Sequence, residues 1–270
     1  MANGLLRISQ ARSGELIMVE RHIKETLGLK DQALALALDD YRKNVSAADL
    51  HMFLFSRLSR PWIEKHVRFE GQEILTQALA HKGLALVLSV HHHHSIFTGA
   101  VLGLWGYPTR HVAMDPTLSP LYLRFQKLSD RYYGESEACL GGGKYIYVRP
   151  EGKSSAGELA EALASPGLVL SLHDFPSDFS PKRQVKVDFF GRKLSFPFGT
   201  VILAEKMKTP MVIACLEKED SGFCLRFSPV RWQEGRDAII QDYGDALKSL
   251  VLRRPGMWEG WKWDRFFGHG

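Results

Sequence analysis

Two groups of polar residues in this sequence have the types and spacing that acid–base chemistry requires. Four consecutive histidines at residues 91–94 follow a run of apolar residues, and His173 is followed by Asp174 and Asp178. An imidazole ring can take up and release a proton near neutral pH, and a carboxylate can hold that ring in a productive orientation. The pattern therefore predicts a general base in the histidine run with an acidic partner in the second group.

The histidine run has two other interpretations. Histidine is a common metal ligand, but consecutive residues cannot all converge on one ion, and no carboxylate or cysteine stands nearby at a spacing typical of metal sites. Alternatively, the histidines cap a helix and satisfy its backbone amides. We expect no metal ion, and we keep a metal-dependent hydrolase that uses His91, His94 and Asp174 as a less favoured alternative.

The composition is that of an ordinary globular protein. The chain has 270 residues, of which 45% are hydrophobic, and a formal net charge of +5. Three scattered cysteines without a CxxC pair indicate neither a disulfide framework nor a zinc ribbon. No signal peptide and no long apolar run are present, so we expect a cytoplasmic protein. The basic residues do not form an aromatic-interleaved helix, and we expect no nucleic-acid partner.

Hydrophobic periodicity predicts a helical arm followed by an α/β domain. Apolar residues at three-to-four spacing predict helices in much of residues 15–65. Further along, helices alternate with short apolar runs, which is typical of a sheet covered on both faces. The main predicted strands are 84–90, 111–114, 167–174, 210–217 and 223–230, and the main predicted helices are 73–81, 95–105, 118–133 and 201–207. We predict a helical N-terminal arm at residues 1–66 and one α/β domain with a mixed sheet at residues 67–270.

The candidate residues follow two of the predicted strands. His91 comes directly after the first buried strand, and Asp174 ends the run at residues 167–174. In an open α/β sheet, ligands bind outside the carboxyl ends of the strands. The longest irregular segment, residues 174–195, begins at the same edge. We therefore expect the two residues to face each other across that edge.

Four longer segments occur in an order and spacing that suggest a family. They read VRFEGQEILTQALAHKG, LVLSVHHHHSIFTGAVLGLWGYP, LHDFPSDFSPKRQVKVDFFGRKLSFPFGTVILAEKMKTPMV and RPGMWEGWKWDRF. Together they resemble the lauroyl/myristoyl acyltransferases of late lipid A biosynthesis, a branch of the lysophospholipid acyltransferase superfamily. The resemblance implies a glycerolipid-acyltransferase-like fold. It also implies transfer of a fatty acyl group from an acyl-carrier protein or CoA thioester to a hydroxyl or amine, with no cofactor beyond the thioester co-substrate.

The resemblance also points to particular residues. Counted back from the GYP turn, the general base of the family's H-x4-D/E motif falls on His91, but its acidic position holds Ile96. The resemblance places Asp174 at the first Asp of the family's DxD loop, where Pro176 replaces the second. We expect Asp174 to supply the missing carboxylate. Otherwise another histidine orients His91, or the chain is a catalytically reduced homologue that only binds acyl groups or lipids.

Further expectations concern substrate and membrane contacts. Charged groups meet the phosphates of a carrier arm or an anionic acceptor, and backbone amides near Ser95 stabilise an oxyanion. The acceptor is a lipid or a small amphipathic metabolite. Without a membrane helix, contact with the inner face of the membrane is peripheral, through the amphipathic arm and basic residues. The tryptophans of the C-terminal segment line an acyl channel, lie at the membrane interface or pack in the core. The expected substrate-binding residues are His94, Lys144, Asp178, Arg183 and Arg254.

Overall fold

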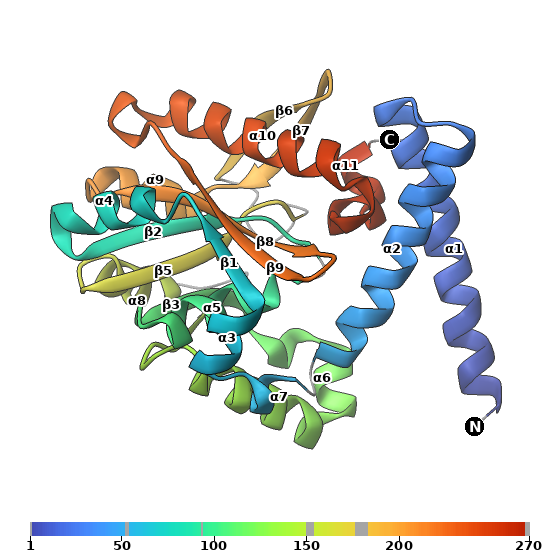
Figure 1. Ribbon diagram of the computed structural model, residues 1–270, viewed down its shortest axis with the longest axis horizontal. Helices are drawn as coiled ribbons and strands as arrows, with labels where there is room; N and C mark the ends of the chain where they lie inside the picture. Colours follow the sequence, from blue (N-terminus) through green and yellow to red (C-terminus); the bar gives the residue numbers. More distant parts are fainter. Residues whose placement is uncertain (1, 52–53, 93, 150–153, 176–182, 268–270) are drawn as a thin grey trace.

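The computed structural model describes residues 2–51, 54–92, 94–149, 154–175 and 183–267. Within these residues the chain forms a helical arm, a seven-stranded sheet covered by helices on both faces, and a two-stranded hairpin (Figure 1). The predicted α/β class with a mixed sheet and a helical N-terminus is therefore confirmed.

The sheet is parallel except at one edge. Its order is β1-β9-β8-β2-β5-β3-β4, and the five strands from β8 to β4 are mutually parallel. β9 returns antiparallel beside β8, and β1 joins β9 in parallel. The strands are β1 (Val67–Glu70), β2 (Leu84–Ser89), β3 (Thr109–Met114), β4 (Tyr145–Val148), β5 (Gly167–Leu172), β8 (Met211–Glu219) and β9 (Gly222–Pro229).

Two apolar clusters enclose the sheet, one on each face. Alternate residues of β2 belong to different clusters: Leu86 faces the hairpin and α10 side, whereas Val87 faces the α3 and α5 side. Every residue of β2 is buried, which explains why its sequence is a continuous apolar run. The covering helices are α3 (Arg60–His66), α4 (Gln72–Lys82), α5 (Ile96–Trp105), α7 (Gln126–Ala138), α8 (Ser154–Ala162), α9 (Gly199–Lys206) and α10 (Arg236–Arg253).

The arm consists of α1 (Ala2–Leu27) and α2 (Asp31–His51), which run beside the C-terminal segment (Figure 1). Leu34, Leu38 and Tyr41 lie on one face of α2 at helical spacing and are buried against the rest of the chain. The C-terminal segment forms the short turns η5 (Pro255–Met257) and η6 (Glu259–Lys262) and the short helix α11 (Asp264–Phe267). The described apolar face of the arm is therefore already covered by this protein.

Two segments differ from the predicted elements. The helix predicted at residues 118–133 is divided into η2 (Pro116–Leu118), α6 (Pro120–Arg124) and α7, because Phe125 leaves the helical conformation. The irregular segment at residues 174–195 contains the hairpin strand β6 (Gln184–Phe189) and the start of β7 (Arg192–Pro197). Alternation in β6 buries Val187 and Phe189 against α10 and the C-terminal turns.

Candidate active site

His91 and Asp174 lie opposite each other at the carboxyl edge of the sheet. Ser89 of β2 pairs with Leu172 of β5, and continuing that register by two residues places His91 beside Asp174. The Nδ1 atom of His91 is 3.0 Å from Oδ1 of Asp174, and the backbone N–H of His91 donates to the same oxygen at 2.7 Å. The structure thus brings together the expected base and the expected acid.

The Asp174 carboxylate is held by three donors. Besides the two groups of His91, the indole N–H of Trp258 donates to Oδ2 at 2.6 Å. The Asp174 side chain is fully buried, and that of Trp258 is fully buried as well. A buried carboxylate that accepts several hydrogen bonds is fixed in position, so it can fix the imidazole in turn. Trp258 is therefore a buried support of the Asp174 carboxylate, and the sequence interpretation missed this contact.

The C-terminal segment delivers Trp258 by pairing with the histidine run. His92 and Trp258 form an isolated antiparallel bridge, and the N–H of Glu259 donates to the carbonyl oxygen of His91 at 3.0 Å. The His91 ring makes edge contacts with Phe175 and Trp263, at centroid distances of 5.7 and 5.6 Å. The His91 side chain is still 29% exposed, so a substrate can reach the ring.

The position expected for the motif acid has a packing role. Ile96 begins α5 and packs against the apolar cluster on the α3 and α5 side of the sheet. The carboxylate beside His91 belongs instead to Asp174, two residues after the end of β5.

His94 contacts the arm and the histidine turn. Its side chain is buried, and its Nε2 atom is 3.2 Å from the side-chain oxygen of Asn44 on α2. The backbone N–H of His94 donates to Nδ1 of His92 at 3.2 Å. These contacts join the histidine turn to the arm, and a role of the buried His94 in substrate binding stays a prediction.

Two of the expected substrate-binding cations lie elsewhere. Lys144 precedes β4 at the amino end of the parallel strands, level with Leu86, and pairs with Glu158 at 3.0 Å. The guanidinium of Arg254 binds both oxygens of Asp40 on α2, at 2.6 and 3.3 Å, and anchors the arm. Lys144 lies at the opposite sheet edge and the Arg254 donors are occupied, so neither lies beside His91 and Asp174; a role of either in substrate binding stays a prediction.

Arg183 and Asp178 are the other two residues expected to bind substrate. Arg183 is exposed just before β6, and its carbonyl oxygen accepts from the N–H of Phe198. Asp178 lies outside the described residues. The proposed role of each in substrate binding stays a prediction.

The backbone amides near Ser95 are largely occupied. Those of Ser95, Phe97 and Thr98 donate to carbonyl oxygens of the same turn, at 2.8 to 3.0 Å. These three amides are therefore occupied, and stabilisation of an oxyanion by the start of this helix stays a prediction. A turn that closes on itself consumes the donors that a helix start would otherwise present.

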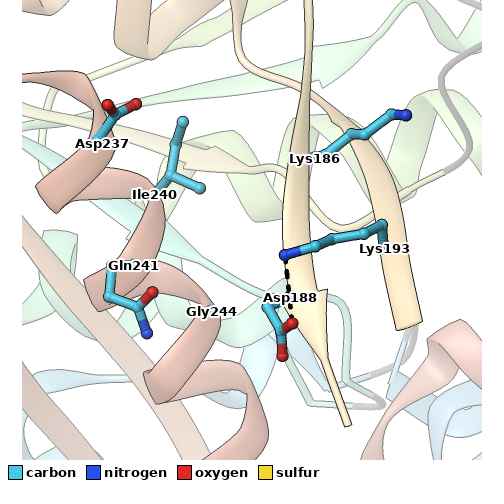
Figure 2. Close-up of a pocket in the computed structure, with 7 residues that line it drawn as sticks. All are labelled: Lys186, Asp188, Lys193, Asp237, Ile240, Gln241 and Gly244. Atoms are coloured by element: carbon cyan, nitrogen blue, oxygen red, sulfur yellow. Dashed lines mark hydrogen bonds and ion pairs between the residues drawn. The ribbon is translucent and has the colours of Figure 1, made fainter. Parts of the chain in front are cut away.

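Two cavities lie away from the His91 ring. One, of about 190 Å³, lies between the β6–β7 hairpin and α10, where Lys193 contacts Asp188 at 3.2 Å (Figure 2). The other, of about 320 Å³, lies after β3 and β4 and is lined by Asp115, Pro116, Thr117, Tyr122, Asp130, Tyr133, Tyr147 and Arg149. The second cavity is at the carboxyl edge of the sheet, the same edge as Asp174.

Two further histidines, His111 and His173, are buried near His91 and Asp174. Burial lowers the pKa of His111 to about 4, and the nearby His91 acts in the same direction. Burial also lowers the pKa of His173 to about 4, against the opposing effects of the Pro197 carbonyl and Asp174. Both imidazoles are therefore neutral at neutral pH, and neither is suited to carry a positive charge there.

This burial predicts an acid-sensitive fold. Between about pH 6.5 and pH 4 the unfolded chain binds protons at these two positions that the folded chain does not, so stability falls as the pH is lowered. At about pH 5 we expect a loss of roughly 2 kcal/mol for each histidine. Urea unfolding of wild type and His111→Phe at about pH 7 and about pH 5 measures it. The variant should lose less stability on acidification, and equal losses in both proteins would contradict this prediction.

The described thiols are poorly suited to nucleophilic chemistry. Cys139, Cys215 and Cys224 are buried, and burial raises the pKa of each thiol, that of Cys224 to about 11. A thiol that stays protonated is a poor nucleophile. Among the described residues, no three His, Cys, Asp or Glu side chains are grouped so that they could hold a metal ion.

Comparison with known proteins does not identify a family. No protein-family model matches the chain, and no curated protein matches its sequence. Within the part of the chain that the structure describes, no helix combines the length and apolar character needed to cross a membrane.

Proposed function

We propose that this protein is an acyltransferase that moves a fatty acyl group from an acyl-carrier protein or CoA thioester to a hydroxyl or amine. The observation that carries the proposal is the contact between His91 and Asp174, whose carboxylate is buried and held from its other side by Trp258. This arrangement orients one imidazole toward a partly open surface, as general-base catalysis requires. The family resemblance of the sequence supplies the reaction type.

In the proposed reaction His91 uses the nitrogen that does not contact Asp174. Asp174 fixes the proton on Nδ1, so Nε2 removes the proton from the acceptor as its oxygen or nitrogen attacks the thioester carbonyl. The new C–O or C–N bond forms, the C–S bond breaks, and the imidazolium returns its proton to the departing thiolate. The carboxylate of Asp174 stabilises the transient positive charge on the ring.

The transfer is proposed to be direct, without an acyl-enzyme. The described cysteines are buried with raised pKa values, so they are poor candidates to carry the acyl group. The acceptor must therefore approach His91 while the thioester is bound. We assign the acceptor to lipids or small amphipathic metabolites and place the protein in the cytoplasm at the inner face of the membrane.

The proposal is tested by measuring thiol release from acyl thioesters of CoA and of acyl-carrier protein. Metal-free wild type is supplied with each thioester alone, then with lipid, amine and hydroxyl acceptors, and the acylated product is identified by mass spectrometry. We expect thiol release that depends on an acceptor and matches the product formed. Thioester binding without release by any acceptor would instead favour the catalytically reduced acyl-binding alternative.

A further inference from the structure

A short segment after β3 carries most of the exposed apolar side chains of the described chain. Nine large hydrophobic side chains are exposed among the described residues, and five of them lie within residues 114–128. We call this group the 114–128 surface, and its members are Met114, Leu118, Leu123, Phe125 and Leu128. Scattered exposed apolar residues are ordinary, but a concentration of them in one segment marks an interaction site.

Other residues of the same segment line a polar cavity. Pro116, Thr117 and Tyr122 line the cavity of about 320 Å³ together with Asp115, whose carboxylate accepts from Thr117 and Arg149. The residues of the segment therefore divide between those that line this polar cavity and those that expose apolar side chains. The breaks around Phe125 that divide the predicted helix make this division possible.

The 114–128 surface lies at the edge of the sheet that carries the catalytic pair. Val112 of β3 pairs with Ser171 of β5, and Asp115 and Asp174 each lie three residues further along. The two aspartates are therefore level on neighbouring strands, whose backbones are about 5 Å apart within a sheet. A partner bound to this surface would lie beside the His91 edge.

Basic residues are interleaved with the apolar ones. Arg124 and Lys127 have no acidic partner among the residues that the structure describes, and the Arg124 guanidinium lies 5.4 Å from the centroid of the Phe125 ring. Apolar side chains flanked by unpaired cations fit the interface of an anionic bilayer, where the apolar groups enter the lipid and the cations meet the headgroups. Among the described side chains of the arm only Ile17 and Leu36 are large, apolar and exposed, whereas the others pack against the C-terminal segment or within the arm.

We propose that the 114–128 surface docks on an anionic lipid bilayer and holds the His91 edge against it. The polar cavity beside the surface then faces the headgroup region, where an amphipathic acceptor presents its reactive group. The role assigned to this docking rests on the proposed function, acyl transfer at His91. Vesicle binding is nevertheless measured without any thioester, so failure to bind and failure to transfer are separate results.

The test uses two substitutions matched in chemistry and exposure. Leu123 is 66% exposed in the surface and Leu252 is 65% exposed on α10, so Leu123→Asp and Leu252→Asp add the same charge at equally open positions. The full chain is sedimented with phosphatidylcholine vesicles that contain or lack phosphatidylglycerol. We expect wild type and Leu252→Asp to bind the anionic vesicles, Leu123→Asp to bind at least about tenfold more weakly, and added salt to weaken binding.

Three results would overturn the proposal. They are no binding by wild type, equal binding by Leu123→Asp and wild type, or equal losses in Leu123→Asp and Leu252→Asp. Wild type that binds no vesicles but does bind an acyl-carrier protein would also overturn it. If Leu123→Asp then lost that binding, the surface would be assigned to an acidic protein. Thermal unfolding of both variants should match wild type, because neither leucine is buried.

Discussion

Replacing His91 by alanine is expected to lower acyl transfer by about 10³-fold, because a positioned general base contributes about 10²- to 10⁴-fold. The imidazole is the only group of the catalytic pair that is partly open, whereas Asp174 is fully buried. The substitution removes the proton acceptor without disturbing the backbone hydrogen bonds that hold the turn. Single-turnover transfer from acyl thioester to acceptor measures the loss.

The control for His91→Ala is His81→Ala, which removes an exposed imidazole from α4. This control should transfer as wild type does. Both variants should bind the thioester with unchanged affinity, because the proposed role of His91 is in proton transfer. Wild-type turnover by His91→Ala would refute its assignment as the base, and loss of thioester binding together with activity would indicate a structural role.

Replacing Asp174 by asparagine is expected to reduce transfer nearly as much. The change keeps the shape of the side chain but removes its charge, and an amide cannot accept from all three donors that converge on the carboxylate. The ring of His91 then loses its fixed tautomer and the stabilisation of its protonated form. In a serine-protease triad the equivalent change costs about 10⁴-fold in kcat.

A second histidine–aspartate contact in the chain gives a matched control. The Nε2 atom of His22 lies 3.1 Å from Asp264, where the arm meets α11. Asp264→Asn should leave transfer unchanged, whereas Asp174→Asn should lower kcat with thioester binding intact. Urea unfolding of both variants separates catalysis from stability, since an unmatched buried hydrogen-bonding group costs about 1 to 3 kcal/mol. Full activity of Asp174→Asn would exclude this carboxylate as the orienting acid.

The sequence alone predicted the main helices and strands and the contact between His91 and Asp174. The apolar runs of β2 and β5 are buried on both faces, so their composition alone predicts strands of a covered sheet. Because parallel strands end at one edge, the residues after them must lie near each other. His91 and Asp174 could therefore be paired from the sequence alone, even though Ile96 stands at the acidic position of the motif.

The sequence did not predict where the charged side chains of Arg254 and Lys144 lie or what they contact. Arg254 has the chemistry of an anion-binding residue, but its pairing with Asp40 depends on how the arm packs. Lys144 has the same chemistry, but strand direction places it at the opposite edge of the sheet. A charged side chain carries no local signal of its partner, because pairing depends on tertiary distance rather than on sequence spacing.

The sequence by itself determined the α/β class, the helical arm and the edge at which His91 and Asp174 meet, since these follow from periodicity and strand direction. Only the tertiary structure decided that Trp258 completes the support of Asp174, from 84 residues away in the chain. It also decided that the 114–128 segment exposes its apolar side chains. Such features arise when separate elements pack, because packing determines which donors meet which acceptors and which apolar faces are left uncovered.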